Sequence, residues 1–127
     1  MTDTERLELA AKAAGYSFDG YVLRNTKTGF EYSGWNPLED DGDAFRLAVR
    51  LSIPFHVFYG QNTVIAYGKK TEHFPEGKDE IVAFTDNPNE STRRAIVLVA
   101  AEIGKTMNET QIKPPTNQNP KASLTKT

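Results

Sequence analysis

A cluster of acidic residues is the first feature with the composition of a chemical site. Glu39, Asp40, Asp41 and Asp43 lie close together in the sequence. Such clusters are typical of calcium loops, but the D-x-[DN]-x-[DN]-G spacing is absent, and Leu51 stands where the loop needs its final glutamate. The same acids precede an apolar helical pattern, where anionic side chains cap backbone N–H groups and complement the helix dipole. We therefore predict helix capping here, and no metal site.

The residues needed for nucleophilic or zinc chemistry are scarce. The chain has no cysteine, and its two histidines are His56, in a β-rich run, and His73, in a charged loop. This spacing does not fit a zinc site. No serine lies in a G-x-S-x-G motif, and no glycine-rich segment matches a phosphate-binding loop. The sequence therefore predicts no cofactor, and it favours a protein that binds over an enzyme.

Two adjacent arginines stand where a cation is unfavourable. Arg93 and Arg94 fall in the first turn of a predicted helix, whose dipole disfavours positive charge. Either acids such as Glu90 or acids from elsewhere pair with them, or they help to hold an anion attracted by the free N–H groups of the helix. The sequence leaves both alternatives open.

Amphipathic aromatic residues gather at the ends of predicted strands, at positions 32, 35, 59 and 67. Such side chains suit ligand rims and interfaces as well as ordinary sheet edges. With arginine nearby, they would fit a nucleotide or phosphorylated ligand through stacking and ion pairing. We expect the 33–40 loop and the start of the last helix to border one concave site. Its candidate binding residues are Tyr32, Trp35, Asn36, Arg93 and Arg94.

Three helices must position these groups. Segments 35–51 and 85–103 each begin with an Asn-Pro turn, continue through a polar cap and end in an apolar helical pattern. The second of these predicts a last helix over about 90–103, ended by Gly104. A first helix over 3–14 is indicated by the capping-box spacing of Thr2 and Glu5, with Gly15 as its stop.

The strands read as two hairpins and a single run. The first hairpin joins 20–24 to 29–32, the second joins 55–59 to 63–67, and 81–84 is expected to be a short buried strand. The element order is then α-β-β-α-β-β-β-α. We predict an α+β fold, a three-layer α-β-α sandwich with a mainly antiparallel sheet between helices. The alternative arrangement has all the helices on one face of the sheet.

The chain divides by composition near residue 104. Residues 105–127 contain three prolines and no aromatic residue, so they cannot bury enough apolar surface to offset the entropy of ordering. We predict a single domain over 1–104 and a disordered polar tail over 105–127.

Charge and hydropathy bear on partners and location. The whole chain has a net charge of −2 while the predicted tail is basic, so the predicted domain is acidic, which argues against nucleic-acid binding. No segment has the ~20 apolar residues of a membrane span. The N-terminal MTDTERLELA lacks the layout of a secretion signal. We therefore expect a cytoplasmic protein with no membrane partner.

These patterns together resemble a known family. The first helix, the hairpin GYVLRNTKTGFEY, the turn Trp35-Asn36-Pro37 leading to DAFRLAVRL, and the closing STRRAIVLVAAEIG resemble the phage ABA-sandwich domain family. The related NinX-like phage accessory proteins share the aromatic-Asn-Pro turn and the Asn-Pro to Arg-Ala entry into the last helix. The resemblance covers residues 3–104. It implies an α-β-α layered fold and an origin in a bacteriophage or prophage, hence the host cytoplasm, and it implies no activity.

The function predicted from the sequence is that of a small phage accessory protein, a non-enzymatic binding module acting on a host protein or a small anionic ligand. One alternative is a nucleotide-sequestering protein or enzyme, which would need a carboxylate such as Asp41, Asp43 or Asp86 in reach of its ligand. Another is a structural virion or assembly component that forms a homodimer through a sheet edge.

Overall fold

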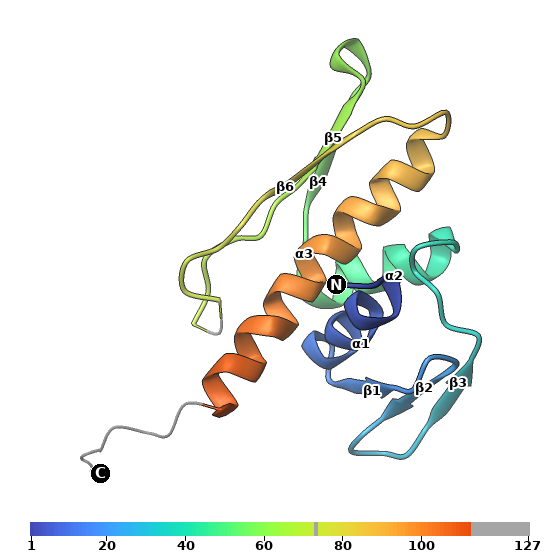
Figure 1. Cartoon of the computed structure of the whole chain (residues 1–127), viewed down its shortest axis with the longest axis vertical. Coiled ribbons are helices and arrows are strands. Elements are labelled where there is room, and N and C mark those ends of the chain that lie inside the picture. Colours follow the sequence, from blue (N-terminus) through green and yellow to red (C-terminus); the bar gives the residue numbers. More distant parts are fainter. Residues whose placement is uncertain (73, 113–127) are drawn as a thin grey trace.

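The computed structural model describes residues 1–72 and 74–112 (Figure 1). Within these ranges the chain forms three α-helices, six short strands and one 3₁₀ turn. In chain order they are α1 (Asp3–Ala13), β1 (Tyr16–Phe18), β2 (Val22–Asn25), β3 (Glu31–Ser33), α2 (Asp41–Leu51), β4 (Phe55–Phe58), η1 (Tyr59–Gln61), β5 (Thr63–Ala66), β6 (Glu80–Ala83) and α3 (Pro88–Ile112).

Helix α1 begins with the predicted capping box. The Thr2 hydroxyl accepts the backbone N–H of Glu5 at 3.1 Å, and the Glu5 carboxylate accepts the N–H of Thr2 at 2.6 Å. Hydrogen bonds from the backbone N–H and the side chain of Thr2 lower the pKa of the Glu5 carboxyl, because they favour its charged form. The helix ends one residue before the predicted 14, and Gly15 follows with a φ of 89°. The prediction for this helix is confirmed.

The first sheet consists of β1, β2 and β3, all antiparallel. The predicted hairpin is its β2–β3 half. Strand β1 was not predicted, since three residues give too short an alternation to recognise. Residues paired in register share a face, so Phe18, Leu23 and Tyr32 lie on one side. On the other side Arg24 and Glu31 form an exposed ion pair. This sheet therefore has an aromatic inner face and a polar, solvated outer face.

The second sheet consists of β4, β5 and β6, again antiparallel. Its register places Val57, Val64 and Val82 on the face that packs against α3. Ile81 points the other way and is 67% exposed. The strand expected at 81–84 is present at Glu80–Ala83, but it is half-buried rather than buried. Strand β6 lies at a sheet edge, and only one of its faces is covered.

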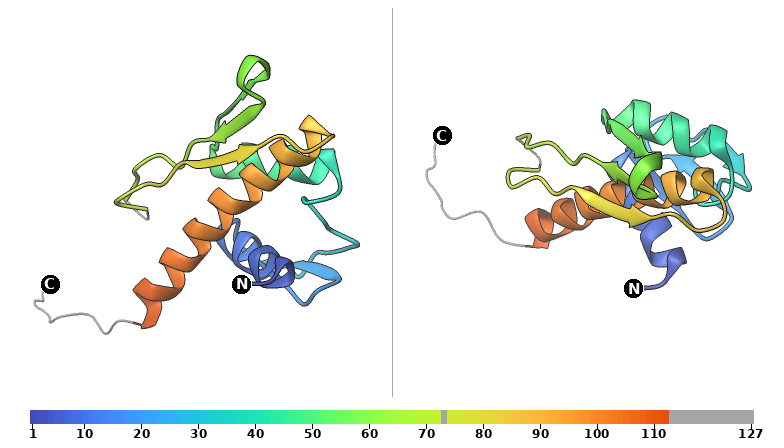
Figure 2. Two further views of the ribbon diagram at one scale, coloured as in Figure 1. Left: turned by 45° about the horizontal axis from the view of Figure 1, so that its top comes forward. Right: turned by 90° about the horizontal axis from the view of Figure 1, so that it is seen from above.

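Helix α3 lies between these layers (Figures 1 and 2). The second sheet packs on one side of it, α1 and α2 pack on another, and the first sheet lies beyond α1. The predicted α+β class, antiparallel pairing and layered sandwich are confirmed. The strands form two sheets rather than one, however, and each sheet is covered on one face only. The helices thus fill the middle of the molecule rather than its outer layers.

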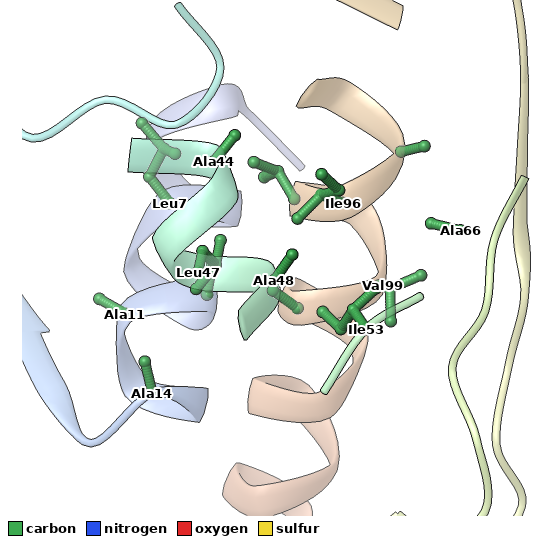
Figure 3. Close-up of a cluster of buried hydrophobic side chains, with 14 of the residues drawn as sticks. Leu7, Ala11, Ala14, Ala44, Leu47, Ala48, Ile53, Ala66, Ile96 and Val99 are labelled. Atoms are coloured by element: carbon green, nitrogen blue, oxygen red, sulfur yellow. The ribbon is translucent and has the colours of Figure 1, made fainter. Parts of the chain in front are cut away.

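The core is built where the three helices meet. Small residues of α1 and α3 let these helices approach closely, and branched side chains from α2 and the 52–54 turn fill the remaining space (Figure 3). Among its buried members are Leu7, Ala11, Leu47, Ala48, Ile53, Ile96 and Val99.

The end of α3 differs from the prediction. The helix continues to Ile112 instead of stopping at Gly104. A Cβ on Gly104 would lie 2.0 Å from the Leu9 carbonyl oxygen, so this glycine serves the close crossing of α1 and α3 rather than a helix end. The predicted tail boundary is therefore wrong for residues 105–112, which are helical. The rest of the predicted tail, 113–127, lies outside the described residues.

We expect Gly104→Ala to destabilise the protein by about 1–3 kcal/mol, because the added methyl group must force α1 and α3 apart. In an uncrowded helix the same change would stabilise by roughly 1 kcal/mol, so the sign is diagnostic. Urea unfolding followed by circular dichroism measures it. Gly60→Ala is the matched control, since a Cβ there meets no atom within 4 Å. A Gly104→Ala protein as stable as the wild type would contradict the proposed role of this crossing.

Candidate functional site

A pocket of about 230 Å³ opens between the inner face of the first sheet and α2. Its buried lining is mostly apolar, and its exposed lining combines aromatic and basic side chains. The buried members are Ala14, Leu23, Trp35, Asp43 and Leu47, and the exposed ones are Phe30, Tyr32, Arg46 and Arg50. Tyr16 and Asn25, both half-buried, complete it.

Two simple periodicities bring these residues together. Alternation along the strands puts Phe30 and Tyr32 on the face that already carries Leu23. On α2, Arg46 and Arg50 are four residues apart, so they lie on one face of the helix. The pocket is therefore the space between an aromatic strand face and a basic helix face.

The aromatic walls differ in their exposure. Trp35 is only 7% exposed and meets Phe18 edge to face, with ring centroids 5.2 Å apart. Phe30, in contrast, is 68% exposed. Trp35 is thus a core residue that also borders the pocket, whereas Phe30 stands free at the rim. A ligand could contact Phe30 without displacing any part of the fold.

Asp43 fixes the shape of this site. Its carboxylate is buried and accepts the backbone N–H of Asn36 at 2.9 Å, an Arg46 N–H at 2.8 Å and the Tyr32 hydroxyl at 3.4 Å. At the same time Asp40 is the N-cap of α2 and accepts the Asp43 N–H at 2.8 Å. The predicted capping role of the acidic cluster is confirmed at Asp40, and Asp43 adds a link between β3, the Asn-Pro turn and α2.

The two pocket arginines have different partners. The hydrogen bond to Asp43 raises the pKa of the Arg46 guanidinium. Arg50 donates through Nε to the Ala14 carbonyl at 2.9 Å, and its guanidinium carbon lies 5.2 Å from the centroid of the Tyr16 ring. Among the described residues, no carboxylate lies within ion-pair distance of Arg50. Arg50 thus brings an uncompensated positive charge to the pocket.

Arg93 and Arg94 do not line this pocket. Arg93 donates through Nε to the Leu38 carbonyl at 2.9 Å and through Nη1 to Asp41 at 2.6 Å. Arg94 pairs with Asp3 at 3.2 Å. Of the two alternatives left open by the sequence, pairing with acids from elsewhere is the one observed. These arginines fasten α3 to the start of α2 and to α1.

Asn36 is also structural. Its side-chain oxygen accepts the Leu38 N–H at 3.0 Å, and its own N–H is held by Asp43. Of the five candidate residues, the structure therefore brings Tyr32 and Trp35 to one pocket and leaves Asn36, Arg93 and Arg94 outside it. Ion pairs and a turn already occupy the polar groups of Asn36, Arg93 and Arg94. The concave site expected between the 33–40 loop and α3 stays a prediction.

Sequence reasoning missed Phe30, Arg46 and Arg50. The four-residue spacing of the arginines beside apolar Leu47 was a visible signal for a basic stripe along the edge of the helix. Nothing in the sequence indicated that this stripe faces β3, because that contact joins segments brought together only by folding.

A second, shallower hollow lies on another side of α2. It is lined by apolar residues that include Phe45, Val49 and Phe55, with Lys69 at its border. Phe45 is 63% exposed, nearly as much as Phe30, and it does not line the first pocket. This hollow therefore supplies a matched control position for experiments on the first.

Residues 1–72 and 74–112 contain neither a cluster of metal-ligating side chains nor a membrane-spanning helix. In these ranges no group of three or more histidine, aspartate or glutamate side chains is placed to hold a metal ion. No helix in them combines the length and the apolar character needed to cross a bilayer.

We expect Asp43→Ala to destabilise the protein by about 1–3 kcal/mol, because the half-buried N–H of Asn36 loses its acceptor. Glu39→Ala is the control: Glu39 is an exposed acid in the same segment, and its loss should change stability by less than about 0.5 kcal/mol. Urea unfolding, read from the fluorescence of the single tryptophan, Trp35, compares the two variants. Equal stability of both variants would refute the linking role of Asp43.

Comparison of the chain with protein-family models, with curated proteins and with solved structures gives no match. The resemblance to phage ABA-sandwich proteins stays a prediction.

Proposed function

We propose that this protein is a small, non-enzymatic binding module that holds a small molecule in the pocket between the first sheet and α2. The observation that carries the proposal is the composition of this pocket. A buried apolar floor with a few polar groups at the rim is the usual make-up of a ligand site, in which apolar contact provides affinity and the polar groups provide orientation.

The state of the polar groups favours binding over catalysis. A general base needs a lone pair within reach of its substrate. The Asp43 carboxylate accepts three hydrogen bonds that hold the turn, β3 and α2 together. Asp41, another acid considered for catalysis, is paired with Arg93 outside the pocket. Both carboxylates serve the fold, which supports a site that holds its ligand unchanged.

The biological setting that we propose follows from the sequence resemblance. It is that of a phage or prophage accessory protein in the cytoplasm of the host, where a small-molecule pocket would serve to sequester or sense a metabolite. A host protein as partner is the alternative from the same setting.

A homodimer through a sheet edge is a second candidate, supported by one observation. Edge strand β4 contains no Asp, Glu, Lys or Arg, and charges are a common means of protecting an edge from pairing. Light scattering after size exclusion distinguishes a dimer from a monomer.

We expect a library of ring-containing fragments, screened by ligand-observed NMR, to yield binders whose contacts include the pocket. Phe30→Ala should weaken them by about tenfold, because it removes an aromatic wall with a contribution of roughly 1 kcal/mol or more. Phe45→Ala should leave binding unchanged, since Phe45 is similarly exposed but lies outside the pocket. Neither change should alter stability much, as both rings are mostly in solvent.

Trp35 gives an independent readout, because it is the single tryptophan and borders the pocket. Bound fragments should change its fluorescence. A library without binders, or binders equally sensitive to Phe30→Ala and Phe45→Ala, would overturn the proposed function.

A further inference from the structure

We propose that the ligand is a single-ring aromatic carboxylate, with its ring between the strand face and α2 and its carboxylate on Arg50. This inference rests on the proposed function and names the ligand class of the same pocket. Four features carry it, namely volume, wall chemistry, net charge and the polarity of the rim.

The volume limits the ligand to about one ring. The pocket measures about 230 Å³, whereas sites for drug-sized ligands measure ~300–1,000 Å³. An engineered apolar cavity of ~150 Å³ in another protein is large enough to bind benzene. The present pocket therefore has room for one six-membered ring and a small substituent, and it is too small to enclose a whole nucleotide.

The walls favour a flat ring over a saturated one. Aromatic side chains line the pocket from β1 and from β3 and its two ends, and Leu23 and Leu47 add apolar surface. Rings pack on one another in offset-stacked or edge-to-face geometry, with a preference beyond the buried area alone. A planar ligand makes these contacts on both faces and at its edge. The aromatic members are Tyr16, Phe30, Tyr32 and Trp35.

The charge of the lining is positive. Its charged members are two arginines and one aspartate. Arg46 is compensated by Asp43 at 2.8 Å, and Arg50 has a carbonyl and an aromatic face as its partners. A carboxylate on the ligand would supply the missing counter-charge. It would also match the planar guanidinium, which binds carboxylates through two parallel hydrogen bonds.

The lining offers a further donor in addition to Arg50. The side-chain oxygen of Asn25 already accepts the N–H groups of Lys27 and Thr28 at 2.9 and 3.1 Å. The group that Asn25 has left to offer is its NH₂, a donor. A ligand whose polar end only accepts hydrogen bonds fits this rim, and an ionised carboxylate is such a group.

The test uses three probes of similar size: benzoate, its neutral counterpart benzamide, and the non-planar anion cyclohexanecarboxylate. Each is titrated into the full chain and followed by Trp35 fluorescence and ligand-observed NMR. We expect benzoate to bind at least about tenfold more tightly than benzamide, because charge-assisted hydrogen bonds are about twice as strong as neutral ones. Cyclohexanecarboxylate should also bind more weakly, since it cannot stack.

Arg50→Gln should reduce benzoate binding to the level of benzamide and leave benzamide binding unchanged. Arg24→Gln, on the outer face of the same sheet, is the matched control and should change neither. If Arg50→Gln fails to fold because it loses the hydrogen bond to Ala14, the wild type still tests the carboxylate assignment. The deciding results are then its preference for benzoate over benzamide and the weakening of benzoate binding by salt.

The outcomes separate this inference from the proposed function. Equal binding of benzoate and benzamide, or benzoate binding insensitive to Arg50→Gln in a folded variant, overturns the carboxylate assignment and leaves a binding module in place. If other fragments bind but none of the three probes does, the carboxylate assignment is likewise overturned and the binding module stays in place. Absence of binding by the probes and by the whole fragment library overturns both.

Discussion

Helix α3 has buried side chains in several directions. Ala95, Ile96 and Val97 are consecutive and all buried, and at about 100° per residue they point to three different sides of the helix. A helix of this kind cannot lie on a surface with one face in water. The remaining elements are arranged by the need to cover it, with the second sheet on one side and α1 and α2 on another. The close approach of α1 at Gly104 is part of the same constraint, because a larger residue there would hold the two helices apart.

The ion pairs of α3 follow from this central position. Arg93 reaches Asp41 and the Leu38 carbonyl, and Arg94 reaches Asp3. Because α3 begins at Pro88, both arginines lie in its second turn and not in its first. The helix dipole acts mainly within the first turn, so the carboxylates, and not the dipole, set the positions of these side chains. Arg93 is also mostly buried. Its hydrogen-bond partners compensate for the hydration that its guanidinium loses on burial. The sequence left open whether these arginines pair with acids or hold an anion, and in the structure they attach α3 to its neighbours.

The candidate pocket depends on a different buried group. Asp43 joins the Asn-Pro turn, β3 and α2 through one carboxylate, and this sets the distance between the aromatic strand face and the basic helix face. The apolar floor is continuous with the core, while the exposed rim carries Phe30 and Arg50. Phe30 can therefore be altered with little effect on the fold, whereas Arg50 also donates a hydrogen bond to Ala14 and serves both the fold and the rim.

The sequence by itself determined the local elements. Spacings of a few residues are enough to predict the capping box of α1, the acidic cap of α2, the two hairpins and the α+β class. These features depend on interactions between residues that are close together in the sequence. Only the tertiary structure decided that the strands form two sheets, that Gly104 is a crossing point rather than a helix end, and that Arg46 and Arg50, not Arg93 and Arg94, face the aromatic residues. Each of these features depends on contacts between segments that lie far apart in the sequence. Local patterns do not indicate which distant carboxylate or backbone group a side chain contacts, because packing between the segments sets the free energy of that contact.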